Sequence, residues 1–543
     1  MAQPQKRKPR PRLGRAGGKS PDRPSRRQGT KRGLIGTGPR RDSIPARVAR
    51  HIRALVGYVV FACILLSSLL QANWVMESKW VEHERLSIIS GQEAFYATEP
   101  DSLDVLFMGT SHAFYSFSPQ MLYDEYGITS HNLGTCAQTM LATRWWVEEA
   151  VKRQSPKAIV LETFAFPWEL NSEYTRMALN GMRWSATKVD AMLDLARGLD
   201  EDPSSYLMSN LLFHDRWEEL EQNDFTGTEC APELRGWLPA FWADGGEGFQ
   251  PLSEEIGEVP EELSDYVRGQ LDRICEVCYL NDIKLVLVTV PSKSWTQEAH
   301  DMTAKYVSEK HGVEYYDLNC AGLYGEIGYD YENDATDEGG HANVDGARKM
   351  TSWVGRLLTS GDYAIEPHED ESFEASHAYL EQSLAEGELF RSKDIDGYIG
   401  NIDLSNHVVL AASPSGMEEE VREVGKRWLE ELGLEPTDGA FVAIAGSTGG
   451  ADGEELRLID DEELSGILEG GLVAYAMDCT EGLPSMTVTA GSGVKRNLMP
   501  MDGTEKWRGM VFVTYDPVHQ VMVDRRLLKA NDYTGEVEMH RMM

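Results

Sequence analysis

Between residues 101 and 360, short apolar runs alternate with longer stretches in which apolar residues recur every three or four positions. The short runs have the length of buried strands, and the longer stretches have the period of amphipathic helices. This alternation predicts an α/β fold over 101–360, with a parallel sheet covered by helices on both faces. Strand candidates lie at 105–108, 130–133, 158–161, 284–290 and 313–316. Helix candidates lie at 118–126, 139–154, 261–281, 297–311 and 343–358, the last with Asn343 as its predicted cap.

An insertion rich in aromatic residues interrupts this alternation at 166–255. Two interpretations of the insertion stay open, because long connections either cover a sheet edge structurally or carry binding residues. In the second case the insertion would form one wall of a substrate cleft. The tryptophans that mark it are Trp168, Trp184, Trp217, Trp237 and Trp242.

The pattern changes after residue 360. An acidic stretch at 366–374 lies within a predicted linker over 361–390. Beyond it, short strand-like runs surround a single helical stretch at 417–432, with Gly433 where a helix C-cap is expected. We therefore predict a second, smaller α+β domain over 391–543. Its strand candidates lie at 408–412, 441–445, 472–476, 486–489 and 511–515.

Residues 54–74 contain no charged side chain and have about the length that crosses a bilayer. A cleaved signal peptide is one interpretation, with 70–72 as the cleavage site. A retained transmembrane signal anchor is favoured, because the preceding basic arm is longer than an ordinary signal-peptide start and the apolar run is longer than its usual core. The segment at 75–100 is then a juxtamembrane spacer.

Positive charge is concentrated before this apolar segment. Residues 1–53 hold 17 Lys and Arg against two Asp, whereas the whole chain carries a net charge of −36. By the positive-inside rule the arm lies in the cytoplasm, and everything after Trp74 lies outside the cell membrane. Its Pro, Gly, Arg and Ser content is typical of a disordered segment.

The charge asymmetry also narrows the classes of partner. A basic arm alone is compatible with nucleic acid, but the membrane segment that follows it argues against that function. The remainder of the chain carries about −51, since the arm contributes about +15. So acidic a surface disfavours a polyanion held by general electrostatics and favours a neutral glycan.

The seven cysteines give no metal motif. Cys63 lies in the membrane segment, and the other six could pair outside the cell in combinations that the sequence does not fix. Cys275 and Cys278 have CxxC spacing, but they lie in a helical pattern and no second pair completes a zinc site. We interpret both as small core residues and predict neither a metal nor another cofactor.

One stretch carries the candidate chemistry. Ser111 follows the apolar run 105–108 by way of Gly109, so a buried parallel strand would deliver its hydroxyl to the sheet edge where α/β proteins place their sites. A base is available in His341, which would take the proton of the serine. The carboxylate of Asp337 or of Glu338 would orient the imidazole.

Donors for a developing oxyanion are the second requirement of such a site. The backbone N–H groups of Ser111 and Gly134 are candidates, and Gln138 offers a side-chain amide. His112 is expected to pack or to hydrogen-bond locally. Lys293 and Trp295 follow the fourth strand candidate, where they would either touch substrate or lie in a solvated loop.

These motifs resemble the SGNH/GDSL hydrolase superfamily over about residues 101–360. The resemblance rests on the run from Gly109 to His112, on the glycine after the second strand, and on an acid-x-x-His-x-Asn motif before the last helix. Within the superfamily, the chain is most similar to the membrane-anchored bacterial branch, such as alginate O-acetylation proteins and the teichoic-acid D-alanine transfer protein. The superfamily normally uses aspartate, which favours Asp337 over Glu338. The Gly-x-Asn-Asp block of the superfamily has no counterpart in this chain. Residues 161–164 occupy the end of the third strand, so the usual Asn donor to the oxyanion is missing, and Gln138 is our substitute for it.

The C-terminal region, over about 391–533, resembles the interleukin-like EMT inducer domain. Its glycines at 397 and 400 and the run from Arg508 to Asp516 carry the likeness. Related domains in glycosyltransferase stems bind sugar, whereas a purely structural β-rich module is an equal alternative. Asp502 and Arg508 are its first candidate residues, without assigned roles.

Together these resemblances imply a serine acyltransferase or esterase that works outside the cell through an acyl-Ser111 intermediate. Its substrate would be a cell-envelope polysaccharide and its acyl group acetyl. A transferase would need an acyl donor delivered by a multi-pass membrane-bound O-acyltransferase, and a hydrolase would not. The alternative is a non-catalytic glycan-binding or assembly protein of envelope polysaccharide biosynthesis with a degenerate fold.

Overall fold

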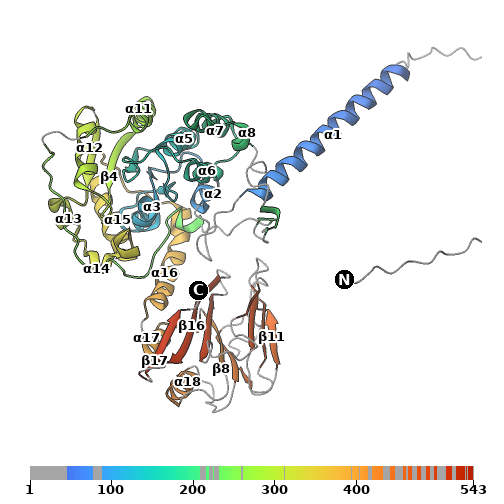
Figure 1. The fold of residues 1–543 in the computed structure, drawn as a ribbon, viewed down its shortest axis with the longest axis vertical. Helices are drawn as coiled ribbons and strands as arrows, with labels where there is room; N and C mark the ends of the chain where they lie inside the picture. The colour runs from blue at the N-terminus through green and yellow to red at the C-terminus, as the bar shows by residue number, and fades with distance from the viewer. Residues whose placement is uncertain are drawn as a thin grey trace, which may run out of the picture. The chain divides into compact units, whose positions relative to one another are not determined.

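The structure is a computed structural model of the 543-residue chain, shown in Figure 1. It describes residues 46–77 and 89–541 with gaps. The gaps are 208–215, 219, 221–223, 226–231, 258–260, 311, 393, 403, 406, 414–418, 432–440, 447–456, 460–462, 468–473, 479–484, 490–494, 498–508, 517–520, 532–533 and 535. The chain divides into two compact units, 1–68 and 69–543, and each is described by itself.

A single long helix, α1 (Ala46–Met76), contains the predicted membrane segment (Figure 1). Its stretch His51–Met76 is long and apolar enough to cross a membrane, with a mean hydropathy of 2.1. Large apolar side chains such as Phe61 and Ile64 are more than half exposed. This exposure is what a lipid-facing helix requires and what a soluble helix avoids.

A five-stranded parallel sheet forms the centre of the larger unit and confirms the predicted α/β fold. The strand order is β2-β1-β3-β4-β5, so β1 lies between β2 and β3. All five strand candidates are strands, with ends within one residue of those predicted. They are β1 (Val105–Met108), β2 (Ser130–Asn132), β3 (Ala158–Glu162), β4 (Lys284–Thr289) and β5 (Val313–Asp317).

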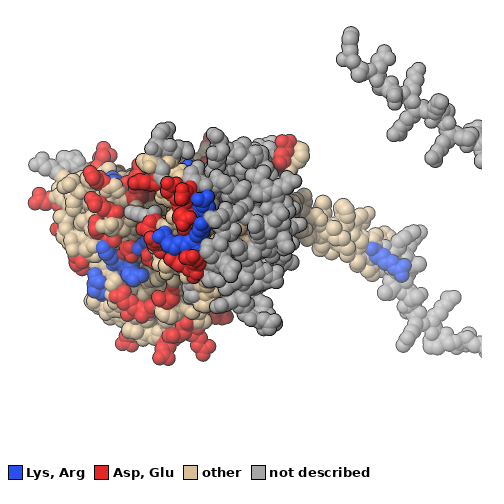
Figure 2. All heavy atoms as spheres, turned by 90° about the horizontal axis from the view of Figure 1, so that it is seen from below, with Lys and Arg blue, Asp and Glu red and all other residues tan. Residues whose placement is uncertain are grey.

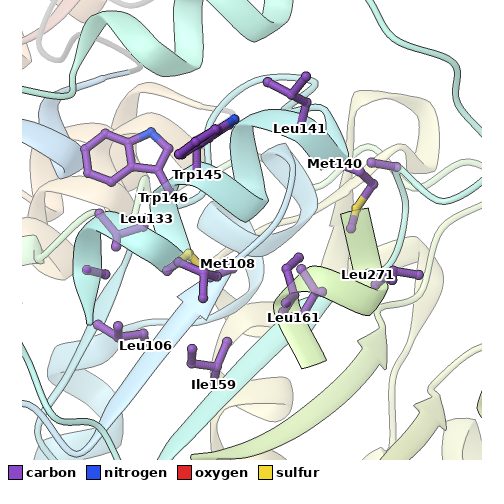
Figure 3. Packing of buried hydrophobic residues seen from close by; sticks show 14 of the residues in the cluster. Leu106, Met108, Leu133, Met140, Leu141, Trp145, Trp146, Ile159, Leu161 and Leu271 are labelled. Carbon is purple, nitrogen blue, oxygen red and sulfur yellow. The ribbon is translucent and has the colours of Figure 1, made fainter. Parts of the chain in front are cut away.

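Helices cover both faces of this sheet, because alternate residues of each buried strand point to opposite sides. On one face Leu106, Ile159 and Leu287 pack against helices α5 (Met140–Ala150), α7 (Ala186–Leu199) and α11 (Asp265–Leu280). Figure 3 shows the interdigitated side chains of this cluster, including Trp146 and Leu271.

The opposite face is covered by a second cluster. Phe107, Val160 and Val288 pack there with Leu122 of α4 (Pro119–Tyr126) and Trp353 of α15 (Val344–Leu358). As predicted, the side chain of Asn343 caps α15, accepting the N–H groups of Asp345 and Gly346. The two clusters leave β1 and β3 buried on both sides, which is why residues 105–108 and 158–161 are continuously apolar.

The aromatic insertion folds partly into helices, α6 (Ser172–Asn180), α7 and α8 (Ser204–Leu207). Trp237 is buried, and its indole N–H donates to the carbonyl of Tyr115 at 3.1 Å. In contrast, Trp184 and Trp217 are about half or more exposed, at 49% and 65%. The insertion thus has a structural part near Trp237 and exposed aromatic rings elsewhere.

The stretch predicted as an acidic linker contains a 21-residue helix, α16 (Glu371–Arg391). The side chain of Asp370 caps it by accepting the N–H groups of Ser372 and Phe373 at 2.9 and 3.2 Å. Phe373 and Leu380 are buried, so this segment is packed structure instead of a plain connection. Glu371 and Glu374 lie in its first turn, where a helix favours negative charge.

The region 391–543 forms a smaller α+β part of the larger unit, as predicted. An antiparallel sheet has the order β10-β9-β8-β15-β16-β17, and a four-stranded sheet has the order β11-β12-β13-β14. Trp428 of α18 (Glu419–Glu431) is buried against Phe512, with ring centroids 4.2 Å apart. Gly433, Asp502 and Arg508 lie outside the described residues.

The strands of this region are β8 (Val408–Ser413), β9 (Phe441–Gly446), β10 (Arg457–Ile459), β11 (Glu463–Ile467), β12 (Ala474–Asp478), β13 (Ser485–Thr489), β14 (Lys495–Asn497), β15 (Met510–Asp516), β16 (Val521–Ala530) and β17 (Val537–Arg541). Four of the five strand candidates of the second domain lie within these strands, and the candidate 472–476 overlaps β12, its first two residues lying outside the described residues.

Candidate active site

Ser111 is the first residue of the short helix α3 (Ser111–Ser116), directly after the turn that ends β1. Gly109 in that turn has φ +142°, and a Cβ there would lie 2.7 Å from the Cβ of Glu162. The turn therefore requires glycine for both its conformation and its space. Thr110 caps α3, its hydroxyl accepting the N–H of His112 at 3.2 Å. These features fix the serine at the carboxyl edge of the sheet.

His341 lies beside the serine, although 230 residues separate them in sequence. Its Nε2 is 2.8 Å from Ser111 Oγ, and its Nδ1 is 3.0 Å from Asp337 Oδ2. A nucleophile, a base and an orienting carboxylate thus follow one another at hydrogen-bond distance, which is the arrangement of a serine triad.

The loop that holds the base is short and strained. His341 begins β7 (His341–Ala342), which pairs with β6 (Ala335–Thr336), and the turn η3 (Asp337–Gly339) connects them. Asp337 and Glu338 both have φ +54°, a region that non-glycine residues rarely adopt. Both predicted carboxylates are exposed, and the one that the structure brings to the imidazole is that of Asp337.

Bonds from neighbouring loops anchor this strained turn. The hydroxyl of Tyr331 donates to the carbonyl of Gly339. The N–H of Lys293 lies 3.2 Å from the Gly339 carbonyl and 2.6 Å from the Tyr331 hydroxyl. The Nζ of Lys293 donates to the carbonyl of Gly245 at 2.5 Å, so this exposed side chain connects two loops.

The three predicted oxyanion donors differ in the hydrogen bonds that they form within the protein. The N–H of Ser111 occupies the first position of α3, where backbone donors have no intrahelical acceptor. The N–H of Gly134, in contrast, donates to Asn132 Oδ1 at 3.0 Å. The Gln138 amide donates to Thr143 Oγ1 at 3.1 Å and accepts the Thr135 hydroxyl at 3.0 Å. Gln138 therefore forms its hydrogen bonds within its own buried loop, because both the N–H and the C=O of a buried amide need a partner.

His112 packs locally, as expected, and lies beside the triad. Its ring stacks on Phe164 with centroids 3.7 Å apart and lies 4.7 Å from the ring of His341. Its Nδ1 is 3.2 Å from Thr110 Oγ1, and its Nε2 is 3.2 Å from Ser292 Oγ. Burial, with His341 as a second cause, holds the pKa of His112 well below its usual value, so this imidazole is neutral.

Glu162, at the end of β3, is a site residue that the sequence analysis missed. Its side chain is buried, and one oxygen accepts the N–H and the hydroxyl of Thr110 at 3.2 and 2.9 Å. The other oxygen accepts the N–H of Phe164 at 2.6 Å. Burial raises the pKa of Glu162 to about 7. The sequence feature that indicates Glu162 is its place as an acidic residue at the end of an otherwise apolar strand, at the catalytic edge of the sheet.

These buried groups form a continuous chain beneath the site. Glu162 contacts Thr110, Thr110 contacts His112, and His112 contacts Ser292. The hydroxyl of Ser292 also lies 3.2 Å from the carbonyl of Gly340, next to His341. The chain therefore connects the turn that carries the nucleophile to the loop that carries the base.

A second cluster of candidate ligands lies near the end of β5, where His300, Asp317 and Cys320 come together. One Asp317 oxygen already accepts His300 Nδ1, Trp295 Nε1 and the Tyr315 hydroxyl at 2.7, 2.9 and 3.0 Å. Burial raises the pKa of the Cys320 thiol to about 12. Because three donors already engage this Asp317 oxygen, we interpret the three residues as a buried hydrogen-bonded cluster.

The cysteines at 275 and 278 lie on α11. Cys278 is buried in the core cluster beside the sheet, as interpreted from the sequence, and Cys275 packs against the same cluster. Burial raises the pKa of Cys278 to about 12. A buried, protonated thiol behaves as a small apolar side chain.

Comparisons with known proteins add little to this geometry. No protein-family model matches the chain, and no curated protein matches it. Among solved structures, a Bacteroides fragilis protein named as an acylhydrolase is 13% identical, with a TM-score of 0.25, and covers 52% of this chain and 98% of its own. A GDSL-like lipase of Bacteroides thetaiotaomicron is 11% identical, with a TM-score of 0.24, and covers 50% and 98%. The function of this chain is therefore inferred from the geometry of the site.

Proposed function

We propose that this chain is a membrane-anchored serine acyltransferase or esterase that forms an acyl-Ser111 intermediate outside the cell. The observation that carries the proposal is the linear contact from Ser111 to His341 to Asp337, at 2.8 and 3.0 Å. Three side chains in that order are what nucleophilic catalysis by a serine requires. The N–H of Ser111 supplies one donor for the oxyanion.

The reaction proceeds in two halves. In the first, Ser111 Oγ attacks the acyl carbonyl while His341 Nε2 takes its proton, and the imidazolium then protonates the departing alcohol oxygen. Asp337 keeps the imidazole in the productive tautomer through Nδ1. In the second half, a water or a sugar hydroxyl gives its proton to His341 and attacks the acyl-serine ester, which releases Ser111. Water makes the protein an esterase, and a sugar hydroxyl makes it a transferase.

The proposed substrate is a cell-envelope polysaccharide, and the proposed acyl group is acetyl. Support comes from the exposed apolar helix His51–Met76, from the basic arm that would hold the N-terminus in the cytoplasm, and from the acidic remainder of the chain. Asp and Glu side chains are spread across the described part of the face in Figure 2. Such a surface favours a neutral polymer. A transferase would also need a multi-pass membrane-bound O-acyltransferase to deliver acyl groups.

One observation favours a second candidate, a non-catalytic glycan-binding or assembly protein. Gly134 N–H and the Gln138 amide, two of the three expected oxyanion donors, are hydrogen-bonded within the protein. A site with too few free donors would stabilise a tetrahedral intermediate poorly. The C-terminal part, if it binds sugar as its resemblance implies, would serve either candidate.

The deciding experiment treats the full-length protein in detergent with a fluorophosphonate probe that labels activated serines. Labelling should require both Ser111 and His341, and it should disappear in Ser111→Ala and in His341→Ala. Matched controls are Ser155→Ala and His377→Ala, which change an exposed serine and an exposed histidine. Absence of labelling in a folded wild-type protein would support the non-catalytic candidate. Transfer of labelled acetyl to water or to an added glycan then separates esterase from transferase.

A further inference from the structure

A small hollow lies at the carboxyl edge of the parallel sheet, between the segment that follows β3 and the segment that follows β4. Its volume is about 180 Å³. Phe164 and Trp168 line it from the β3 side, and Ser294, Trp295 and Glu298 line it from the β4 side. Ligands of open α/β sheets bind outside the carboxyl ends of the strands, so the hollow lies where part of a substrate is expected.

The hollow adjoins the triad through stacked rings. Phe164 forms one wall, and the ring of His112 stacks on Phe164 at 3.7 Å. The His112 ring in turn lies 4.7 Å from the ring of His341, the base beside Ser111. Through these rings the wall of the hollow is connected to His341, whose Nε2 is 2.8 Å from Ser111 Oγ. A group that occupies the hollow can therefore belong to the same molecule as the ester at Ser111.

Two aromatic rings form a corner in the hollow. Phe164 and Trp168 are nearly perpendicular, at 89°, with ring centroids 5.5 Å apart, and both are partly exposed. Trp295 is buried behind them, and its indole N–H is held by Asp317 at 2.9 Å. Fixed aromatic faces bind ligands by contact with little loss of side-chain entropy. They suit a flat, rigid ligand whose C–H groups can lie against a ring.

The rim of the hollow is polar. Ser294 and Glu298 are exposed there, and they offer a hydroxyl and a carboxylate to hydroxyl groups of a ligand. No Lys or Arg is among the described lining residues, and the nearby Lys293 Nζ is bound to the Gly245 carbonyl. An anionic ligand would thus meet Glu298 without a compensating cation. A long acyl chain would require a closed apolar channel, which an exposed polar rim does not provide.

We propose that this hollow is a subsite for one uncharged sugar ring of the polymer that carries or receives the acyl group, with Trp168 and Phe164 as its stacking faces and Glu298 as an acceptor for ring hydroxyls. This inference rests on the proposed function, which identifies that polymer as the substrate of Ser111. The binding itself does not depend on whether Ser111 reacts.

The first test compares two acetyl esters with the full-length protein, O-acetylated cellotetraose and 4-nitrophenyl acetate. The ratio of their kcat/KM values measures how much the sugar contributes. Trp168→Ala should lower this ratio about tenfold, mainly through a higher KM for the sugar ester, and Trp168→Tyr should restore most of it. Trp184→Ala removes an exposed tryptophan elsewhere in the insertion and should leave the ratio unchanged. An unchanged ratio in Trp168→Ala, or an equal loss on both esters, would overturn the subsite.

The second test measures binding alone. Unmodified cellotetraose is titrated into Ser111→Ala and into Ser111→Ala with Trp168→Ala, and saturation-transfer NMR reports which sugar protons contact the protein. Contact should be seen in the first variant and lost in the second. If the wild-type protein neither labels with fluorophosphonate nor cleaves either ester, but this Trp168-dependent binding persists, the subsite stands and the catalytic proposal fails. Absence of binding in Ser111→Ala, with a folded chain by circular dichroism, overturns the subsite.

Discussion

The two halves of the candidate triad are held in different ways. On the nucleophile side, Thr110, His112 and Glu162 are all buried and hydrogen-bonded around the turn that carries Ser111. On the base side, Asp337 is 47% exposed at its side chain and has a left-handed backbone conformation, as does Glu338. One half is fixed by burial and the other by a strained turn.

This difference predicts which half of the triad tolerates amino-acid substitutions better. Buried polar chains fail as a unit, because removing one member leaves another unsatisfied in a low-dielectric environment. An exposed strained turn responds in smaller steps, since its members are partly solvated and its strain can be relieved locally. Substitutions on the two sides should therefore differ in size, and the following predictions test that.

The largest effect is expected from the reacting pair itself. Ser111→Ala and His341→Ala should each lower kcat about 10⁶-fold, because each removes the nucleophilic pathway. The double variant should be little worse than either single one, since the pair acts as a unit. Ester hydrolysis by the purified full-length protein measures this. Losses that multiply in the double variant would show that the two residues act separately.

A smaller effect is expected from the orienting carboxylate. Asp337→Asn should lower kcat about 10²- to 10⁴-fold, because an amide no longer fixes the Nδ1–H tautomer of His341. Glu338→Gln, the neighbouring matched change, should alter kcat less than about twofold. If Glu338→Gln instead causes the larger loss, the acid of the site is Glu338 and the contact from Asp337 is incidental.

On the nucleophile side, Glu162 should make stability depend on pH. The folded chain binds this proton with a pKa of about 7, above the ordinary value of 4.5, so its contribution is fully present below pH 4.5 and is lost as the pH rises towards 7. We expect the free energy of unfolding to fall by about 3 kcal/mol across that window relative to Glu162→Gln. Urea unfolding at several pH values measures the difference. Parallel curves for the two proteins would contradict the prediction.

The smallest effects should come from the base loop. Glu338→Gly should stabilise the protein by about 0.5–1 kcal/mol, because glycine adopts φ +54° without the steric cost that glutamate has. Gly339→Ala should destabilise it instead, since φ is +91° and a Cβ would lie 2.4 Å from Tyr331 Cε1. Thermal unfolding of the two variants measures both changes. A stabilising Gly339→Ala would show that the turn relaxes more freely than its contacts indicate.

Local sequence patterns are sufficient to predict the α/β core. The strands at β1 and β3 are buried on both faces, so their apolar runs are continuous and their ends are sharp. The same local pattern placed Ser111 after β1 and His341 before α15, and parallel strands deliver their ends to one edge of a sheet. The capping role of Asn343 was also readable, because a cap depends only on its neighbours in sequence.

Which polar side chains contact one another in the site depends on contacts between distant segments. The contact of Asp337 with His341, in place of Glu338, depends on two left-handed residues whose conformation no local pattern requires. Glu162 and Ser292 became parts of the site because β3 and β4 bring them to the turn after β1 and to the His341 loop. The helix at α16 is stabilised by burying Phe373 against distant elements, which its acidic composition concealed. Local sequence patterns determine which helices and strands form, whereas contacts between distant segments determine which hydrogen-bond partner each polar group has.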